Sequence, residues 1–412
     1  MVTPPGGDMA SPELPTATSV STYSIGQLTS YFLHLGTFGF GGPVALVGYM
    51  HRDLVETRRW ISEAEYKEGL TLAQLMPGPL AAQLAIYLGY VHYGILGATA
   101  AGLAFVFPSF LMVLGLGWAY AEFGGIGWMQ AVFYGVGATV IGIIALSAWK
   151  LTQKTVGRSP LLWGIYAASA ATTIVTESEP ILLFLGAGVL VWGVRAAQRR
   201  RAAAISLPAI ALPTVLQTPL VELLTQIALF FTKAGAFVFG SGIAIVPFLY
   251  SGVVKEYGWL DDQEFLDAVA VAMITPGPVV ITVGFIGYLV TGRGADFWTG
   301  TAGATVAALA TFLPCYLFTV IPAPYFKKHG KRPGIVAFVD GVTAAAVGAI
   351  AGACLVLGRR TVFGDGWTPD WIKVALLVLT VALVIRFRKL PEPFVVLGAA
   401  VAGLLIYPLV HG

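Results

Sequence analysis

The sequence predicts an all-α polytopic membrane protein of two homologous inverted repeats, with about 10 transmembrane helices and two re-entrant Pro-Gly-Pro hairpins. Composition is the first observation: of 412 residues, 57% are apolar and 11% are charged, whereas soluble domains have about 25% charged residues. The second is a mean hydropathy of +0.80, spread along the whole chain. The third is an internal duplication. Together these observations exclude a soluble enzyme.

Charge and cysteine content narrow the class further. The net charge of +3 comes from short basic clusters between apolar runs, a pattern that excludes nucleic acid as a partner. Cys315 and Cys354 lie inside apolar segments and indicate neither a disulfide framework nor a metal site. Residues 1–24 are rich in Pro, Ser and Thr and lack Lys and Arg, so we expect a disordered tail without a cleavable signal peptide.

The duplication becomes visible when the chain is aligned with itself at an offset of 199 positions. Without a gap, this offset superposes Gly36, Gly41, Trp60, Glu65 and Pro77-Gly78-Pro79 on Gly235, Gly240, Trp259, Glu264 and Pro276-Gly277-Pro278. After small insertions, Pro108, Gly135 and Gly142 meet Pro314, Gly341 and Gly348. We therefore expect a first repeat over 25–200 and a second over 219–412. Because the interval 201–218 contains Pro208 and Pro213, it is expected to be a linker on the membrane surface.

Apolar stretches recur in both repeats, and most of them are long enough to cross a hydrocarbon core of ~30 Å, although 180–194 and 374–385 are short. In the first they are 25–50, 69–91, 94–121, 123–149, 159–176 and 180–194. The basic clusters at 195–201, 327–332 and 386–389 share the cytoplasmic side only if each Pro-Gly-Pro segment enters the membrane and returns. Five crossings per repeat then invert the second repeat and leave both termini external. Arg359 and Arg360 do not fit this scheme.

Helix interruptions at matched positions form the candidate anion site. Gly and Pro should divide the first stretch of each repeat into two half-helices, and each Pro-Gly-Pro should end one short helix and begin another. A half-helix that begins at mid-membrane directs unpaired N–H groups and partial positive charge inward, which favours an anion. The alternative is that these residues only kink helices for packing. The candidate residues are Gly39, Phe40, Gly41, Gly42, Pro43, Pro77, Gly78, Pro79, Phe239, Gly240, Ser241, Gly242, Pro276, Gly277 and Pro278.

Two ionisable residues near the interruptions are further candidates. His34 and Lys233 correspond at the 199 offset, and an ionisable group inside a spanning segment is costly, which favours a functional role. Lys233 could pair with an oxyanion directly, and His34 could do so when protonated; a packing role is the alternative. Uncharged candidates that can donate hydrogen bonds to an oxyanion are Gln74, Gln83, Ser241, Thr275 and Thr282.

One acidic pair also corresponds between the repeats. Glu68 and Asp267 could carry a coupling proton, or they could be solvated caps or interfacial ion pairs at the mouths of the hairpins. HExxH, paired histidine ligands, a P-loop and GxSxG are all missing from the sequence. The chain is therefore expected to be no enzyme, to hold no cofactor or metal, and to contain no ATPase motor.

The paired motifs resemble those of the chromate ion transporter family in its long, two-domain form. Phe40-Gly41-Gly42-Pro43 and Met76-Pro77-Gly78-Pro79 recur as Phe239-Gly240-Ser241-Gly242 and Thr275-Pro276-Gly277-Pro278, and the resemblance covers about 25–410. It implies a multi-pass carrier of the bacterial inner membrane that exports chromate and gives chromate resistance. Because the second repeat departs from Gly-Gly-Pro at Ser241, the two halves need not contribute equally.

The residues alone leave other functions open. Sulfate shares the tetrahedral shape and double charge of chromate, so helix termini and one or two cations would discriminate poorly between them. A passive anion channel would conduct without saturation or coupling. The expected partners are chromate or a similar oxyanion and the lipid bilayer; the direction of transport, the coupling ion and a homo-oligomer stay open.

Overall fold

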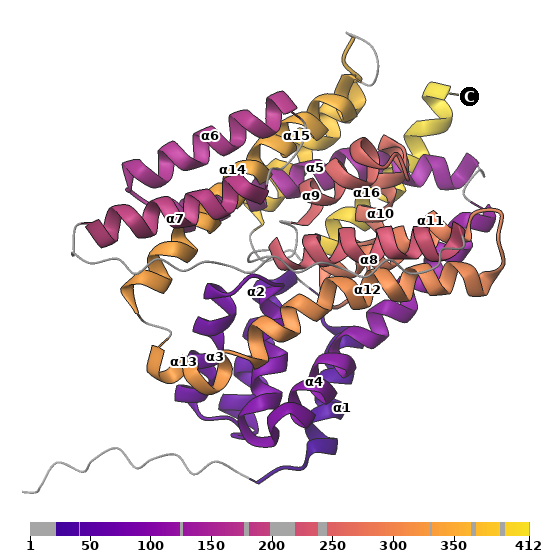
Figure 1. The fold of residues 1–412 in the computed structure, drawn as a ribbon. Helices are drawn as coiled ribbons and strands as arrows, with labels where there is room; N and C mark the ends of the chain where they lie inside the picture. Colours follow the sequence, from indigo (N-terminus) through magenta and orange to yellow (C-terminus); the bar gives the residue numbers. More distant parts are fainter. Residues whose placement is uncertain are drawn as a thin grey trace, which may run out of the picture.

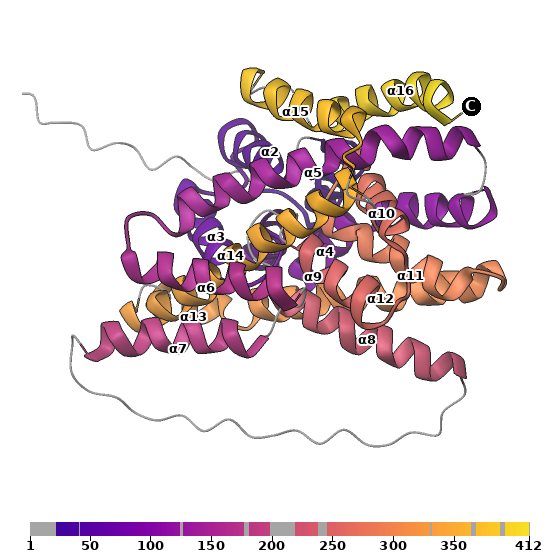
Figure 2. The same cartoon turned by 90° about the horizontal axis from the view of Figure 1, so that it is seen from above.

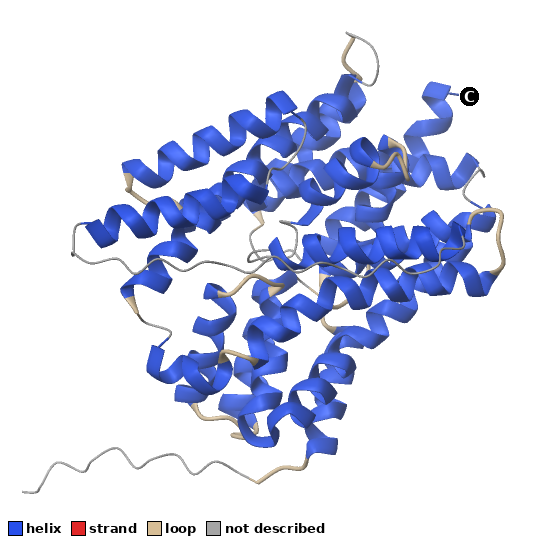
Figure 3. Ribbon diagram, in the orientation of Figure 1, coloured by secondary structure: helices blue, strands red, loops and turns tan. Residues whose placement is uncertain are grey.

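The computed structural model describes residues 22–40, 42–123, 127–176, 181–197, 219–237, 245–329, 332–363, 368–387 and 392–411. All regular elements in these ranges are helical (Figure 3). Five helical stretches are long and apolar enough to cross a membrane: Leu80–Phe123, Gln130–Gln153, Pro219–Phe237, Phe297–Phe326 and Pro333–Phe363. The expected all-α membrane class is therefore confirmed.

The two halves contain similar series of helices, although among the described residues the second half adds η3 and α13 and has α11 and α12 where the first has α4 (Figure 1). The first half contains α1 (Ile25–Phe38), α2 (Gly42–Met50), the π-helix η1 (His51–Thr57), α3 (Glu63–Leu75), α4 (Leu80–Phe123), α5 (Gly127–Thr155), α6 (Pro160–Thr176) and α7 (Ile181–Ala197). The second contains α8 (Pro219–Phe237), α9 (Ile245–Tyr250), the π-helix η2 (Ser251–Glu256), α10 (Asp262–Ile274), the 3₁₀ turn η3 (Val279–Ile281), α11 (Thr282–Gly292), α12 (Phe297–Val320), α13 (Ala323–His329), α14 (Pro333–Phe363), α15 (Trp371–Arg386) and α16 (Glu392–His411).

Local features recur at the offset found in the sequence. The π-helices η1 and η2 are each followed by a tryptophan, Trp60 or Trp259, whose N–H donates back to a carbonyl at 2.8 Å. Ser62 starts α3 and Asp261 starts α10, each through a capping box with a glutamate three residues later. The short helix expected before the first Pro-Gly-Pro is α3, with Ser62 as its N-cap and Met76 as its C-cap.

The first apolar stretch does not cross in one direction, contrary to the expectation for 25–50. The Tyr23 ring, just before α1, stacks on Trp60 at a centroid separation of 5.0 Å. The Tyr31 hydroxyl of α1 donates to Asp53 of η1 at 3.4 Å. Both ends of the segment therefore lie together, and α1 with α2–η1 forms a helical hairpin. The physical reason is the interruption itself: Gly39 ends α1 in an extended conformation and the chain turns back.

The next segment, α3 with the first part of α4, returns to the same place. The Tyr93 hydroxyl donates to the Tyr23 carbonyl, and His92 hydrogen-bonds the Tyr23 hydroxyl at 2.7 Å. Gly94 then breaks α4 with φ +57 and ψ −144, and the chain reverses. A Cβ on Gly89 would lie 2.3 Å from the Gly97 carbonyl, so the two parts of α4 are in backbone contact. Glycines 287 and 303 bring α11 and α12 equally close around Gly294.

The long helices α5 and α14 are exchanged between the halves, which means that each packs along helices of the other half. α14 packs along α6 and α7 of the first half, and α5 packs along α15 and α16 of the second (Figure 2). Glycines make both contacts close: a Cβ on Gly348 would lie 2.3 Å from the Tyr166 carbonyl, and one on Gly135 would lie 2.1 Å from the Ala399 carbonyl. The matched glycines of the sequence thus mark the places where helices from different halves touch.

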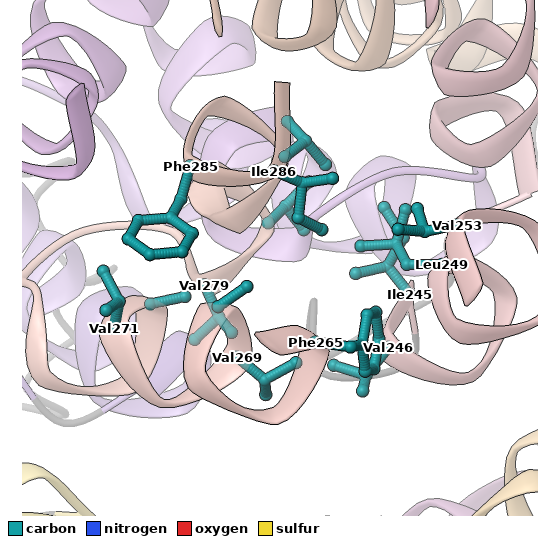
Figure 4. Packing of buried hydrophobic residues seen from close by; sticks show 14 of the residues in the cluster. Ile245, Val246, Leu249, Val253, Phe265, Val269, Val271, Val279, Phe285 and Ile286 are labelled. Atoms are coloured by element: carbon teal, nitrogen blue, oxygen red, sulfur yellow. The ribbon is translucent and has the colours of Figure 1, made fainter. Parts of the chain in front are cut away.

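Three clusters of buried apolar side chains hold the helices together. The first hairpin unit, which we define as residues 22–93, forms one cluster with the second part of α4 and with α12 and α13. A second cluster joins α8 to α12 with α4, α5, α14 and α16, and Figure 4 shows part of it around Phe265, Val279 and Phe285. The third joins α6 and α7 to α14.

Candidate functional site

The interrupted segments of the two halves meet in the interior. The N–H of Gly277, in the second Pro-Gly-Pro, donates to the carbonyl of Gly39, where α1 ends, at 3.1 Å. The Ser109 hydroxyl of α4 lies 2.8 Å from the Pro276 carbonyl and 3.3 Å from the Gly36 carbonyl. Three segments that are far apart in the sequence therefore share one buried, polar junction, which we call the central junction.

Glycine is required at the centre of both Pro-Gly-Pro motifs. Gly78 has φ +143 and Gly277 has φ +88, a region that residues with a Cβ rarely adopt. A Cβ on Gly277 would lie 2.1 Å from the Ser109 Oγ, and one on Gly78 would lie 2.5 Å from the Gln83 amide nitrogen. The Gln83 side chain is fully buried and donates to the Pro77 carbonyl at 2.7 Å. Side chains from α4 thus hold both motifs in place.

Helices begin directly after both motifs, as the sequence predicts. Pro79 is followed by α4 at Leu80, and Pro278 is followed by η3 and α11. The first N–H groups of a helix have no partner within it and carry partial positive charge. The helix starts can therefore stabilise an anion by their N–H dipoles, without making or breaking a covalent bond, whereas the Ser109 hydroxyl and the Gly277 N–H already donate to main-chain carbonyls.

The remaining interruption residues are only partly described. Phe40 is 39% exposed, and α2 begins at Gly42 and Pro43. Gly41 and the equivalent segment of the second half, Phe239, Gly240, Ser241 and Gly242, lie outside the described residues. Their part in the candidate site stays a prediction.

The two hairpins differ in exposure around their Pro-Gly-Pro motifs. Thr275, Pro276, Gly277 and Pro278 are all buried. In the first half, Gly78 and Pro79 are buried, whereas Pro77 is half-buried and Gln74 is exposed. The first motif is therefore more accessible than the second.

The structure does not bring His34 and Lys233 to the central junction. Both side chains are exposed, on the faces of α1 and α8 opposite to the buried residues Phe32 and Phe231. The His34 ring lies 5.1 Å from the ring of Phe38, which is itself exposed. The two residues match each other in position, and their role toward an anion stays a prediction.

The acidic pair also has two different environments. Asp267 is 4% exposed and accepts hydrogen bonds from the Tyr120 hydroxyl at 2.7 Å and from the Gln263 amide at 2.8 Å. Glu68 is half-exposed and lies near Tyr87 of its own hairpin. Asp267 is therefore a buried carboxylate held by two uncharged donors. This burial does not fit the alternative that Asp267 is a solvated cap.

A family model described as chromate transporter matches residues 26–192 and 225–404. The chain belongs to the chromate transporter family. It is 63% identical to a chromate transport protein of Cupriavidus metallidurans, over 98% of this chain and 100% of that protein. It is 62% identical to a probable chromate transport protein of Synechococcus elongatus, over 93% and 96% of the two chains. A chromate transport protein of Pseudomonas aeruginosa is 30% identical to this chain, over 93% of this chain and 92% of that protein. No solved structure matches the chain.

Membership of the chromate transporter family makes this chain a multi-pass membrane transport protein. The family is one of transporters and not of enzymes. Within the described ranges, no group of three or more His, Cys, Asp or Glu side chains is placed to hold a metal ion.

Sequence reasoning missed two residues that the structure of this chromate transporter family member places beside candidate site residues. Ser109 joins the central junction, and Tyr120 holds Asp267; both lie on α4. A signal for Ser109 exists, because it follows Pro108, which the repeat alignment matches to Pro314. Tyr120 has no equivalent signal, since its contact depends on how α4 passes α10.

Proposed function

We propose that this chain exports chromate across the bacterial inner membrane and thereby gives resistance to it. Chromate would be held near the midplane of the bilayer by the N-termini of the half-helices that follow the two Pro-Gly-Pro motifs. The observation that carries this proposal is the Gly277 to Gly39 hydrogen bond, because it brings the interruptions of both halves together in the interior. The relatives named as chromate transport proteins supply the substrate.

We further propose that the two halves are repeats of opposite orientation. The second part of α4 links the first hairpin unit to its equivalent in the second half, α8 to α11, which we call the second hairpin unit. Near the start of this part of α4, Thr99 lies 2.8 Å from Tyr316 of α12, and near its end the Tyr120 hydroxyl donates to Asp267. α12 passes from the second unit, where Gly303 contacts Gly287, to the first, where Phe326 of α13 is buried. Equivalent helices thus run in opposite directions between the units, which supports inversion.

The hairpins change the proposed number of crossings. With α1–α2 and α3–α4 returning to the side they came from, each repeat crosses four times: by the second part of α4, α5, α6 and α7, and by α12, α14, α15 and α16. Ala197 and Pro219 then lie on opposite sides of the membrane; the linker predicted between them, 201–218, lies outside the described residues. The basic clusters at 195–201, 327–332 and 386–389 still share one side, the cytoplasm.

Ion pairs account for basic residues on the external side of this scheme. Arg360, which the charge rule did not explain, lies 3.2 Å from Asp262. Arg293 lies 2.5 Å from Glu264. A basic side chain paired with a carboxylate adds little net charge to its side of the membrane, so these residues are compatible with an external position.

The test is uptake of labelled chromate into inside-out vesicles that contain the protein, with vesicles lacking it as the control. Saturable, energy-dependent uptake that excess sulfate does not inhibit supports chromate export. Strong competition by sulfate would instead favour a general oxyanion carrier. Uptake that neither saturates nor depends on energy would favour a passive channel and contradict the proposal.

A further inference from the structure

The two hairpin units pack differently against α5, α6, α7, α14, α15 and α16, which we call the outer helices. α10 of the second unit packs on α5 and α16, and α9 packs on α14. In the first unit, α3 packs on α4, η1 and α13, and α2 packs on α4 and η1. Among the described residues, neither α2 nor α3 packs on the outer helices α5, α7 or α14 to a comparable extent.

The buried clusters show the same difference. The cluster around α8 to α12 includes Val140 of α5, Leu357 of α14 and Val396 of α16. The cluster around α1 to α4 contains, among the described residues, no side chain from α5, α6, α7, α14, α15 or α16. The second unit is therefore joined to the outer helices by a continuous core, and the first is not.

Exposure at matched positions follows from this packing. Met273 of α10 is 4% exposed, whereas its equivalent in α3, Gln74, is exposed. Leu266 is 5% exposed, whereas its equivalent, Lys67, is exposed and pairs with Glu63 of its own helix at 3.0 Å. The face of α10 that contains Leu266 and Met273 is buried, whereas the equivalent face of α3 contains the polar residues Lys67 and Gln74 and is exposed.

We infer that α3 and α10 are two alternating gates, and that the structure has the α10 gate closed and the α3 gate open. In the alternative state α3 packs on α14 and α7 as α10 now packs on α5 and α16, while the second unit separates from the outer helices. The inference rests on the proposed function and deepens it, because it names the gates through which the oxyanion reaches the central junction.

The repeat alignment specifies which residues meet in the alternative state. At present Gly137 of α5 faces Leu266 of α10, since a Cβ on Gly137 would lie 3.7 Å from the Leu266 Cδ1. The equivalents of this pair are Thr343 of α14 and Lys67 of α3. Closing the first gate therefore brings Lys67 to Thr343, one helical turn from Asp340. Asp340 now pairs with Arg195 of α7 at 2.6 Å, and Lys67 would approach this existing ion pair.

The proposed topology assigns a side to each gate. The open gate, α3, lies with Arg58 and Arg59 on the cytoplasmic side, and the closed gate, α10, lies on the external side. The structure is thus a cytoplasm-open state, in which the central junction is reached past the polar face of α3. This is the state that would load an exported anion.

The experiment is cross-linking of introduced cysteine pairs in the full chain in native membranes, with mass spectrometry of the linked peptides. Cys315→Ser and Cys354→Ala remove the natural thiols; serine already occupies the equivalent of Cys315 at Ser109. One variant carries Gly137→Cys with Leu266→Cys, and the other carries Lys67→Cys with Thr343→Cys. A short methanethiosulfonate cross-linker is applied with and without chromate.

We expect both pairs to cross-link well above a matched control, Lys67→Cys with Ile335→Cys. Ile335 is an exposed residue of α14, about 12 Å from Thr343 along the helix. We also expect chromate to change the two yields in opposite directions. The inference is overturned if the cysteine pair at 67 and 343 gives no higher cross-linking yield than the control pair at 67 and 335 under any condition. It is also overturned if the pair at 137 and 266 does not cross-link.

The cross-linking yields and the transport assay separate the two proposals. Cross-linking of both pairs in a protein that does not transport chromate would support the gates and contradict the substrate. Chromate transport by a protein in which 67/343 never links would support the substrate and contradict the gates.

Discussion

Gly277 donates its backbone N–H to the carbonyl oxygen of Gly39 at 3.1 Å, so the two halves touch main chain to main chain. Both residues interrupt helices, and neither position has room for a side chain. A Cβ on Gly39 would lie 2.2 Å from the Leu35 carbonyl, and one on Gly277 would lie 2.1 Å from Ser109. The interruptions are thus required for the halves to meet, and their loss should be measurable.

Gly277→Ala should abolish chromate transport and lower stability by about 1–3 kcal/mol, because the new Cβ overlaps Ser109 and the backbone has a positive φ. Gly258→Ala is the matched control, since Gly258 also has a positive φ but nothing lies within 4 Å of its Cβ position. Adding Ser109→Ala to Gly277→Ala should recover part of the stability in thermal unfolding. No recovery would show that backbone strain alone causes the loss.

Gly36→Ala and Gly235→Ala should each lower the melting temperature in detergent, because their Cβ positions lie 2.3 Å and 2.1 Å from the carbonyls of Phe105 and Thr311. Backbone carbonyls cannot move away cheaply, and overpacking of this kind costs about 1–3 kcal/mol. Gly115→Ala, in open space on α4, should be neutral or stabilising by up to about 1 kcal/mol. Equal melting temperatures for all three variants would contradict the close helix approach.

Asp267→Asn should remove the dependence of chromate flux on an imposed pH gradient if this buried carboxylate carries the coupling proton. Tyr120→Phe removes one of its two donors and should lower stability by about 1–3 kcal/mol while keeping that dependence. Glu68→Gln changes the half-exposed equivalent and is the comparison. Unchanged coupling in Asp267→Asn would assign Asp267 a structural role.

Asp370 should make stability depend on acid pH. Burial acts to raise its pKa, but the Tyr134 hydroxyl at 2.6 Å and the N–H groups that start α15 lower the pKa below its usual value. A carboxyl with a lowered folded-state pKa contributes stability above about pH 4, the unfolded value, and loses it as pH falls through the lowered pKa. Asp370→Asn should therefore melt earlier than wild type at pH 7 and show a smaller loss on acidification. Parallel melting curves against pH for the two proteins would disprove this.

Lys233→Met should strongly reduce transport if its charge offsets that of the anion, and Lys233→Arg should keep part of it. His34→Gln should flatten a rise in transport on mild acidification without abolishing transport. Vesicle uptake between about pH 6 and pH 8 checks both, since an unperturbed histidine titrates near ~6.5. Because both side chains are exposed and away from the central junction, normal transport by both variants would leave the helix termini as the binding groups.

Much of the fold could be predicted because it depends on local chemistry. The capping residue Ser62, the proline after Gly78 and the glycines at 135 and 348 each act through their own backbone or through missing side-chain volume. Such effects are visible in sequence. The helical class, the start and end of α3, and the helix starts after both Pro-Gly-Pro motifs followed from them.

What could not be predicted depends on contacts between distant segments. Whether 25–50 crosses or turns back depends on Tyr23 meeting Trp60, and either path fits the same hydropathy. The burial of Asp267 and the exposure of Glu68 depend on how the hairpins pack against the outer helices, although their sequence positions are equivalent. Hydropathy and charge counts contain no information about such contacts.

The exchange of α5 and α14 has a consequence for biosynthesis. When α6 and α7 emerge from the ribosome, the helix that will cover them, α14, begins only at Pro333 and has not been made. The surfaces of α6 and α7 that pack against glycines of α14, such as those at the Tyr166 and Ala187 carbonyls, stay exposed to lipid until the second half is made. A chain stopped after Ala197 would keep these surfaces uncovered, so the first half should mature only when the second half is supplied, on the same chain or separately.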